Sequence, residues 1–159
     1  MFPPGRAASI SHSAGIAVAV ARAPGRGLPL GCDLELRPLP RAAARLVLCA
    51  DEAALLDGEV TPLGAGAMPD GEETPFAVGA AWSVTELFSA EEAAWKALAL
   101  PEDVRRTGPA GSLRDLRAPH RGGLLVCPRT DPAHAVRVRV ARVGAGVFSY
   151  VLSRAGARG

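Results

Sequence analysis

The chain contains a single lysine. Lys96 is the only lysine among 18 basic residues in a chain of 159 residues, and all the others are arginine. This bias, together with abundant alanine, glycine and proline, is typical of a GC-rich genome, so no single arginine indicates phosphate binding. The net charge of +2 is too small to predict a nucleic-acid partner. The position of the one lysine therefore carries more information than that of any arginine.

Cysteines and long apolar runs are also scarce. Cys32, Cys49 and Cys127 are far apart in the sequence and show no CxxC or Cys/His spacing of a zinc site. A sparse, odd set of cysteines favours a reducing cytoplasm. No apolar run approaches the length of a membrane-spanning helix, and residues 15–21 are too short and too weakly flanked for a signal peptide. We therefore expect a cytoplasmic protein with no membrane partner.

The acidic residues are concentrated in the middle of the chain. Residues 46–104 contain twelve acidic residues and one basic residue, whereas residues 105–159 contain eleven arginines and two aspartates. Residues 1–45 are also basic, with six arginines against two acids. This distribution suits a metal–phosphate site that faces an anionic ligand, and it suits a patchy solvated surface equally well.

Hydrophobic patterning predicts an α+β fold, with an antiparallel sheet and a long packed helix. The strongest helical periodicity ends at Pro101, and the segment Ser89-Ala90-Glu91-Glu92 resembles a capping box within it. Glycine and proline leave residues 57–75 without periodicity, which predicts a long mobile loop. We expect strands or hairpin arms at residues 10–21, 28–36, 124–126, 136–140 and 147–152, short helices at 41–48 and 51–56, and the long helix at 76–100; the last two strands form a hairpin across residues 144–146.

Two carboxylates alternate in the second predicted strand, Gly31-Cys32-Asp33-Leu34-Glu35. Residues two apart in a strand face the same side, so Asp33 and Glu35 repel each other unless a cation or hydrogen-bond donors lie between them. Mg²⁺ prefers such oxygen ligands together with substrate phosphate. Taken alone, the pair fits a solvated strand edge as well.

Two further segments carry candidate site residues. Glu92 and Lys96 are four apart and share a helix face, either as a plain surface pair or as a carboxylate beside a compact charge suited to a phosphate oxygen. The segment Ser9-Ile10-Ser11-His12-Ser13 offers three hydroxyls and an imidazole, which can bind a phosphate or serve as turn chemistry.

The order of these segments resembles the signature of the 4′-phosphopantetheinyl transferases. Ser-Ile-Ser-His-Ser is followed by Gly-Cys-Asp-Leu-Glu and then by Phe-Ser-Ala-Glu-Glu-x-x-Trp-Lys-Ala. The long bacterial type, which includes enterobactin synthetase component D, has Ser-x-Ser-His, Gly-x-Asp-x-Glu and Phe-Ser-x-Lys-Glu-x-x-x-Lys segments. The resemblance covers residues 2 to about 152 and extends to the Phe-Pro-Pro-Gly stretch before Ser9.

The resemblance implies an Mg²⁺-dependent enzyme that transfers the phosphopantetheine arm of coenzyme A to a serine of an acyl or peptidyl carrier protein. In that family pattern Asp33, Glu35 and Glu92 hold Mg²⁺ against the pyrophosphate, and Glu92 also helps to deprotonate the serine. Lys96 neutralises a phosphate oxygen, and Ser11 with His12 contacts the nucleotide end of coenzyme A. The expected carrier belongs to a peptide, polyketide or siderophore pathway, and Arg41 with Arg45 are candidates for docking it.

The chain departs from the family pattern at two places. Glu91 stands where the family has lysine, which has the wrong sign if this side chain approaches a phosphate, although it can also point away from the site. Long-type members also carry a further N-terminal half. We therefore expect residues 1–27 to be a remnant of that half, residues 28–154 a C-terminal half-domain and residues 155–159 a disordered tail; a misplaced start codon, a truncated gene and a half-protein that forms a homodimer all remain open.

Two other functions remain open at this stage. The chain can be a truncated, non-catalytic homologue with residual coenzyme A binding, which Glu91 and the short start favour. It can also be a small interaction domain whose acidic middle and basic C-terminal strands dock protein partners.

Overall fold

The computed structural model describes residues 7–22, 29–57, 81–98, 112–118 and 124–154. The predicted loop from residue 58 onward and the predicted tail at 155–159 lie outside these ranges. Within them, the strands are β1 (Ala7–Ser13), β2 (Ile16–Arg22), β3 (Gly31–Glu35), β4 (Leu116–Arg117), β5 (Leu125–Pro128), β6 (Val136–Val143) and β7 (Gly146–Arg154). The α-helices are α1 (Ala44–Val47), α2 (Ala53–Leu56) and α3 (Val84–Leu98), with short 3₁₀ turns at Arg41–Ala43, Leu113–Asp115 and Pro132–His134.

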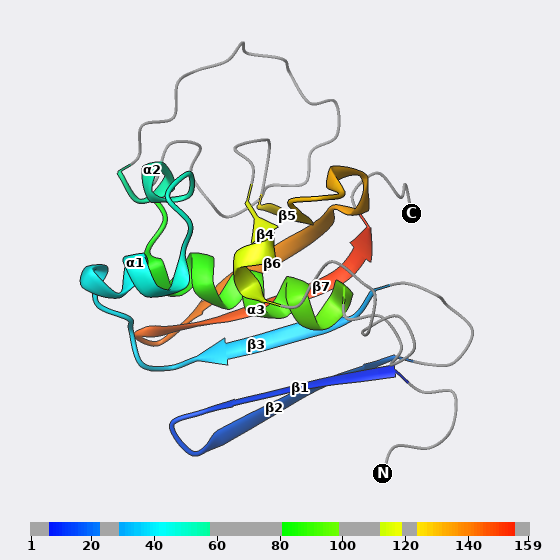
Figure 1. The fold of residues 1–159 in the computed structure, drawn as a ribbon. Coiled ribbons are helices and arrows are strands. Elements are labelled where there is room, and N and C mark those ends of the chain that lie inside the picture. The colour runs from blue at the N-terminus through cyan, green and yellow to red at the C-terminus, as the bar shows by residue number, and fades with distance from the viewer. Residues whose placement is uncertain (1–6, 23–28, 58–80, 99–111, 119–123, 155–159) are drawn as a thin grey trace, which may run out of the picture.

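The predicted α+β class and the antiparallel pairing are confirmed. Five strands form one antiparallel sheet in the order β3-β7-β6-β5-β4, and α3 packs across one face of it (Figure 1). The β6–β7 hairpin turns at Gly144 and Ala145, as the glycine-rich turn predicted. β4 is only two residues long and was not predicted, because so short a segment shows no alternation.

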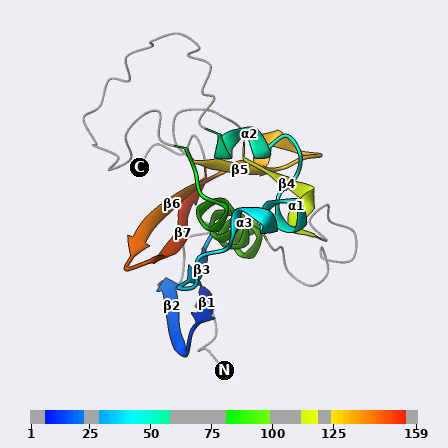
Figure 2. The same cartoon turned by 90° about the vertical axis from the view of Figure 1, so that its left-hand side faces the viewer.

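β1 and β2 form a separate two-stranded hairpin that lies below β3 and projects away from the main sheet (Figure 2). Its turn consists of Ala14 and Gly15, both with positive φ, as a tight two-residue hairpin requires. The sequence predicted a buried strand or a hairpin arm here. That prediction is wrong, because residues 10–21 contain the turn of a complete hairpin instead of one strand or one arm. β2 has no buried residue, and Ile16 is 54% exposed.

The core lies between α3 and the sheet. Leu87, Ala90 and Ala94 of α3 are buried against Val147 and Val151 of β7. Among the described residues, no helix is both long enough and apolar enough to span a membrane.

The long helix begins at Val84, later than its predicted start. Ser83 and Glu86 form a reciprocal cap: the Glu86 backbone N–H donates to Ser83 Oγ at 3.1 Å, and the Ser83 N–H donates to Glu86 Oε2 at 2.8 Å. The capping box predicted at Ser89–Glu92 is wrong, because Ser89 lies inside the continuous helix and is fully buried.

Candidate functional site

β3 places Asp33 and Glu35 on the face of the sheet that α3 covers. Their cross-strand partners on β7 are Ser149 and Val147, and Val147 belongs to the core that packs against α3. Asp33 is 3% exposed, whereas Glu35 is partly exposed at the end of the strand. The two carboxylates share one face of the strand, as the alternation predicted, and the structure buries Asp33 while it leaves Glu35 at the rim.

α3 approaches β3 closely because residue 31 is glycine. A Cβ at Gly31 would lie 2.0 Å from the Ala93 carbonyl oxygen and 2.7 Å from the Ala97 nitrogen, distances that no side chain tolerates. Any other residue would push the helix away from the strand. The close approach is what brings the side chains of α3 into contact with Asp33.

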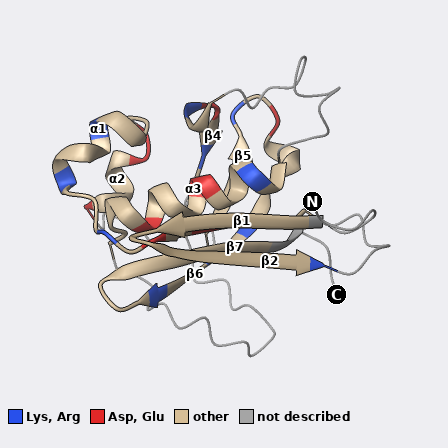
Figure 3. Cartoon of the chain, turned by 90° about the horizontal axis from the view of Figure 1, so that it is seen from below, with Lys and Arg blue, Asp and Glu red and all other residues tan. Residues whose placement is uncertain are grey.

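Lys96 lies between the carboxylates of two elements. Its Nζ is 2.9 Å from Asp33 Oδ1 and 3.6 Å from Glu92 Oε2, and it also donates to the Cys32 carbonyl at 3.2 Å. The single lysine of the chain thus supplies the cation at this cluster in the structure. Figure 3 views the molecule from the side of the β1–β2 hairpin and shows acidic segments, in red, on α3.

The acidic groups perturb one another. Burial raises the pKa of Glu35 most, and the nearby carboxylates of Asp33 and Glu92 raise it further, while Lys96 and His12 oppose the rise. Burial also raises the pKa of Glu92, with Lys96 opposing and Asp33 adding to the increase. Asp33 and Glu92 both form an ion pair with Lys96, whereas Glu35 forms none with it. The ligand atoms of Asp33, Glu35 and Glu92 do not all lie within 4.8 Å of one another.

The hairpin joins the site through three alternate serines of β1. Ser9, Ser11 and Ser13 each accept a hydrogen bond through Oγ from a backbone N–H of the β3 segment, at 2.9, 3.1 and 3.0 Å. These hydroxyls satisfy the free edge of β3, which has no strand on that side within the described part of the chain. The donors are the N–H groups of Cys32, Leu34 and Leu36.

Ser11 and His12 are therefore placed differently. Ser11 also donates to Asp33 Oδ1 at 2.9 Å, so its hydroxyl is used within the protein. His12 points to the opposite face of β1 and is exposed, yet it is near enough to Glu35 to lower the pKa of that carboxyl. Of the two, the His12 side chain is the one that can meet a ligand from solvent.

Glu91 points away from this cluster. Its carboxyl group therefore does not stand beside the proposed phosphate site, where the family has lysine. It is 1% exposed and lies against Glu52, on a different face of α3 from Glu92. Burial, a hydrogen bond with Glu52 and the Glu52 charge together raise the pKa of Glu91 to about 10. Glu91 is consequently protonated at neutral pH and adds no negative charge beside Lys96.

Glu52 connects Glu91 to the segment around α2. It accepts backbone N–H groups of Cys49 and Ala118 through its two oxygens, each at 2.9 Å. Cys49, Asp51 and Glu52 bring ligand atoms within 4.8 Å of one another. Arg129 already supplies the cation there, because it binds both oxygens of Asp51 at 2.9 Å and lies 3.7 Å from Glu52. No sequence motif marked this cluster: Cys49, Asp51 and Glu52 are neighbours in the sequence without a recognised ligand spacing, and Arg129 joins them only in the fold.

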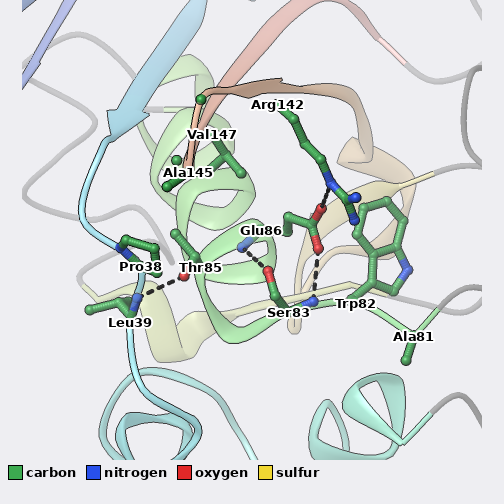
Figure 4. Close-up of a pocket in the computed structure, with 12 residues that line it drawn as sticks. Pro38, Leu39, Ala81, Trp82, Ser83, Thr85, Glu86, Arg142, Ala145 and Val147 are labelled. Carbon is green, nitrogen blue, oxygen red and sulfur yellow. Dashed lines mark hydrogen bonds and ion pairs between the residues drawn. The ribbon is translucent and has the colours of Figure 1, made fainter.

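A cavity of about 460 Å³ lies at the start of α3, away from Lys96 (Figure 4). Its polar groups are engaged within the protein: Glu86 Oε1 accepts from Arg142 Nε at 3.1 Å, and Thr85 Oγ1 accepts from the Leu39 N–H at 2.8 Å. The indole of Trp82 forms one wall. We assign this cavity a structural role at the helix cap.

Two comparisons with known proteins give no match. No protein-family model matches the chain, and a search of curated proteins finds no match. The function proposed for the chain therefore rests on the motif resemblance and on the geometry around Asp33.

Proposed function

We propose that the chain is a phosphopantetheinyl transferase half-domain that moves the 4′-phosphopantetheine arm of coenzyme A to a serine of an apo-carrier protein. The observation that carries the proposal is the grouping of Asp33 from β3 with Glu92 and Lys96 from α3, with Glu35 at the rim and Ser11 and His12 of β1 beside them. These are the residues that match the family pattern, and they come from three separate elements. The resemblance thus describes a cluster in space as well as an order in sequence.

The donor set has the oxygen chemistry that a hard divalent cation prefers, and its carboxylates must close in from their present spacing to share one ion. Asp33, Glu35 and Glu92 supply oxygen ligands, which Mg²⁺ prefers, and Lys96 occupies the position of a cation between two of them. A bound Mg²⁺ would neutralise charge on the pyrophosphate oxygens. The residues that would hold it are Asp33, Glu35 and Glu92.

The chemistry requires one proton transfer and one displacement at phosphorus. The carrier serine oxygen forms a bond to the phosphorus that bears the pantetheine arm, and the bond from that phosphorus to the bridging oxygen breaks. Adenosine 3′,5′-bisphosphate leaves with the bonding electrons, and the serine proton passes to a base. Glu92 suits this role because its raised pKa makes its carboxylate a stronger base than an exposed glutamate.

The positions of Lys96, His12 and Ser11 suggest the role of each in the proposed reaction. Lys96 has a flexible stem, so its ammonium can move from Asp33 to a phosphate oxygen when a divalent ion takes its place. His12 is exposed near Glu35 and would contact the nucleotide end. Ser11 would act by fixing Asp33.

Release of adenosine 3′,5′-bisphosphate tests the proposal. The pure chain is incubated with coenzyme A, Mg²⁺ and an apo-carrier, and the nucleotide products are separated by chromatography. We expect release that requires both the carrier and Mg²⁺, and a loss of about 10²–10⁴-fold in rate for Glu92→Gln. Release without carrier, or an unchanged rate in Glu92→Gln, would contradict the assignment.

A further inference from the structure

Two buried polar atoms at the centre of the site have no hydrogen-bond partner. Asp33 Oδ2 and Ser149 Oγ are both inaccessible and unpaired, in residues that are 3% and 0% exposed. Leaving a buried acceptor and a buried donor both unsatisfied costs free energy that a single hydrogen bond between them would recover.

The sheet register places these two residues opposite each other. Asp33 on β3 and Ser149 on β7 are direct cross-strand partners, so both side chains stand on the same face with Cβ atoms about 4.5–5.5 Å apart. The neighbouring partners, Val147 and Val151, show that this is the face covered by α3. A serine hydroxyl can therefore reach the carboxylate by rotation about χ1, or through one buried water.

We propose that Ser149 is a positioning residue for Asp33, donating a hydrogen bond to Oδ2. The two oxygens of Asp33 then have separate roles. Oδ1 faces Ser11 and Lys96, where the cation lies, and Oδ2 is held from behind by β7. This arrangement fixes the plane of the carboxylate, as partners of metal ligands commonly do.

A double-mutant cycle in unfolding stability tests the hydrogen bond without reference to activity. Ser149→Ala should lower the denaturation midpoint of the parent, and should leave it unchanged or raise it in an Asp33→Ala background, because the acceptor is then gone. Ser11→Ala is the positive control, since Ser11 donates to Asp33 directly. Ser9→Ala is the negative control: this buried serine bonds the Cys32 backbone instead, so its effect should be independent of Asp33.

Asp33→Leu, which keeps the branch at Cγ and has no hydrogen-bond acceptor, replaces Asp33→Ala if the alanine variant does not fold. If Ser149→Ala raises the midpoint equally in both backgrounds, the Ser149 hydroxyl has no hydrogen-bond partner in the fold and the proposal is overturned. A loss of stability that is the same with and without Asp33 also overturns it.

The effect of Ser149 on catalysis rests on the proposed transfer reaction, and it is measured separately as the Mg²⁺ requirement of that transfer. Ser149→Ala should raise the Mg²⁺ concentration for half-maximal transfer by about tenfold or more, with the KM for the carrier unchanged, and Ser149→Thr should restore it. If the parent shows no transfer, the proposed function fails while the stability cycle still decides the hydrogen bond. If the parent is active and its Mg²⁺ requirement is the same in Ser149→Ala, the positioning role is wrong.

Discussion

Ser11 and Lys96 both donate hydrogen bonds to the same oxygen of Asp33, Oδ1. The geometry of the site therefore depends on the orientation of this one buried carboxylate. Lys96 neutralises it in the structure, and a divalent ion that binds there must compete with this ammonium. The motifs singled out Asp33 and Lys96 as site residues, but their ion pair was not predicted. The hydroxyl of Ser149 was not singled out, since its link to Asp33 exists only in the sheet register.

Asp33→Ala should remove the stabilisation that Mg²⁺ gives in the presence of coenzyme A. Saturating ligand at about 100 times its Kd stabilises a fold by about 2.7 kcal/mol, and we expect a comparable increment in the parent. Thermal unfolding with and without Mg²⁺ measures it. Asp131→Ala, which removes an exposed acid from the turn before β6, should keep the full increment; an equal response to Mg²⁺ in Asp33→Ala and the parent would place the metal elsewhere.

The raised pKa of Glu91 predicts that the free energy of unfolding declines as the pH rises. Its pKa is raised from the ordinary value of 4.5 to about 10 in the folded state, so the folded chain binds this proton more tightly than the unfolded chain. The contribution is fully present below about 4.5 and is lost progressively as the pH rises toward about 10.

Glu91→Gln should flatten this decline, because glutamine keeps a donor toward Glu52 and has no proton to lose. The measurement is the denaturation midpoint at intervals between pH 5 and 9, within the window set by these two pKa values. Glu91→Met, which has similar volume and no donor, should be less stable than Glu91→Gln at every pH. Parallel pH profiles of the parent and Glu91→Gln would show that Glu91 is ionised in the fold.

At the scale of elements, the packing of α3 on β3 decides whether the site exists. Periodicity predicted the helix and alternation predicted the strands, but the start of the helix was wrong. The pattern Ser-x-x-Glu occurs at residues 83–86 and again at 89–92, and local sequence does not distinguish them. Tertiary packing does, because Ser89 is buried against the sheet while Ser83 is exposed and free to cap.

Ser83→Ala should cost about 1 kcal/mol of unfolding free energy, the usual effect of losing an N-cap. Ser83→Asp keeps an acceptor for the Glu86 N–H and should retain most of the stability. Chemical denaturation of the three proteins checks this, and an unchanged midpoint in Ser83→Ala would show that the cap contributes nothing.

Gly31→Ala should separate β3 from α3. The added methyl would meet backbone atoms of Ala93 and Ala97, which cannot move independently of the helix. We expect a loss of about 1–3 kcal/mol and, beyond that, a loss of Mg²⁺-dependent stabilisation, because Lys96 and Glu92 move away from Asp33. Gly144→Ala, at a positive-φ turn with open space around it, should cost about 1–2 kcal/mol while keeping the response to Mg²⁺.

At the scale of the whole molecule, the proposed function predicts that surface charge governs how a carrier approaches. Arg41 is paired with Asp57, whereas Arg45 on α1 is exposed. We expect the exposed arginine to attract an acidic carrier, so Arg45→Glu should raise the KM for the carrier several-fold with kcat nearly unchanged. The defect should shrink as salt rises, and Arg45→Lys should behave as the parent. Parental kinetics in Arg45→Glu at low salt would place the carrier elsewhere.

The intact mass of an apo-carrier after incubation with the chain tests the central claim most directly. With coenzyme A and Mg²⁺ present, the account predicts that the carrier gains the mass of one phosphopantetheine arm, and that it gains none when Mg²⁺ is chelated or when its acceptor serine is replaced by alanine. Asp33→Ala and Glu92→Gln should leave the carrier unmodified over the time in which the parent modifies it completely. A carrier whose mass stays unchanged with the folded parent chain, coenzyme A and Mg²⁺ would contradict the account.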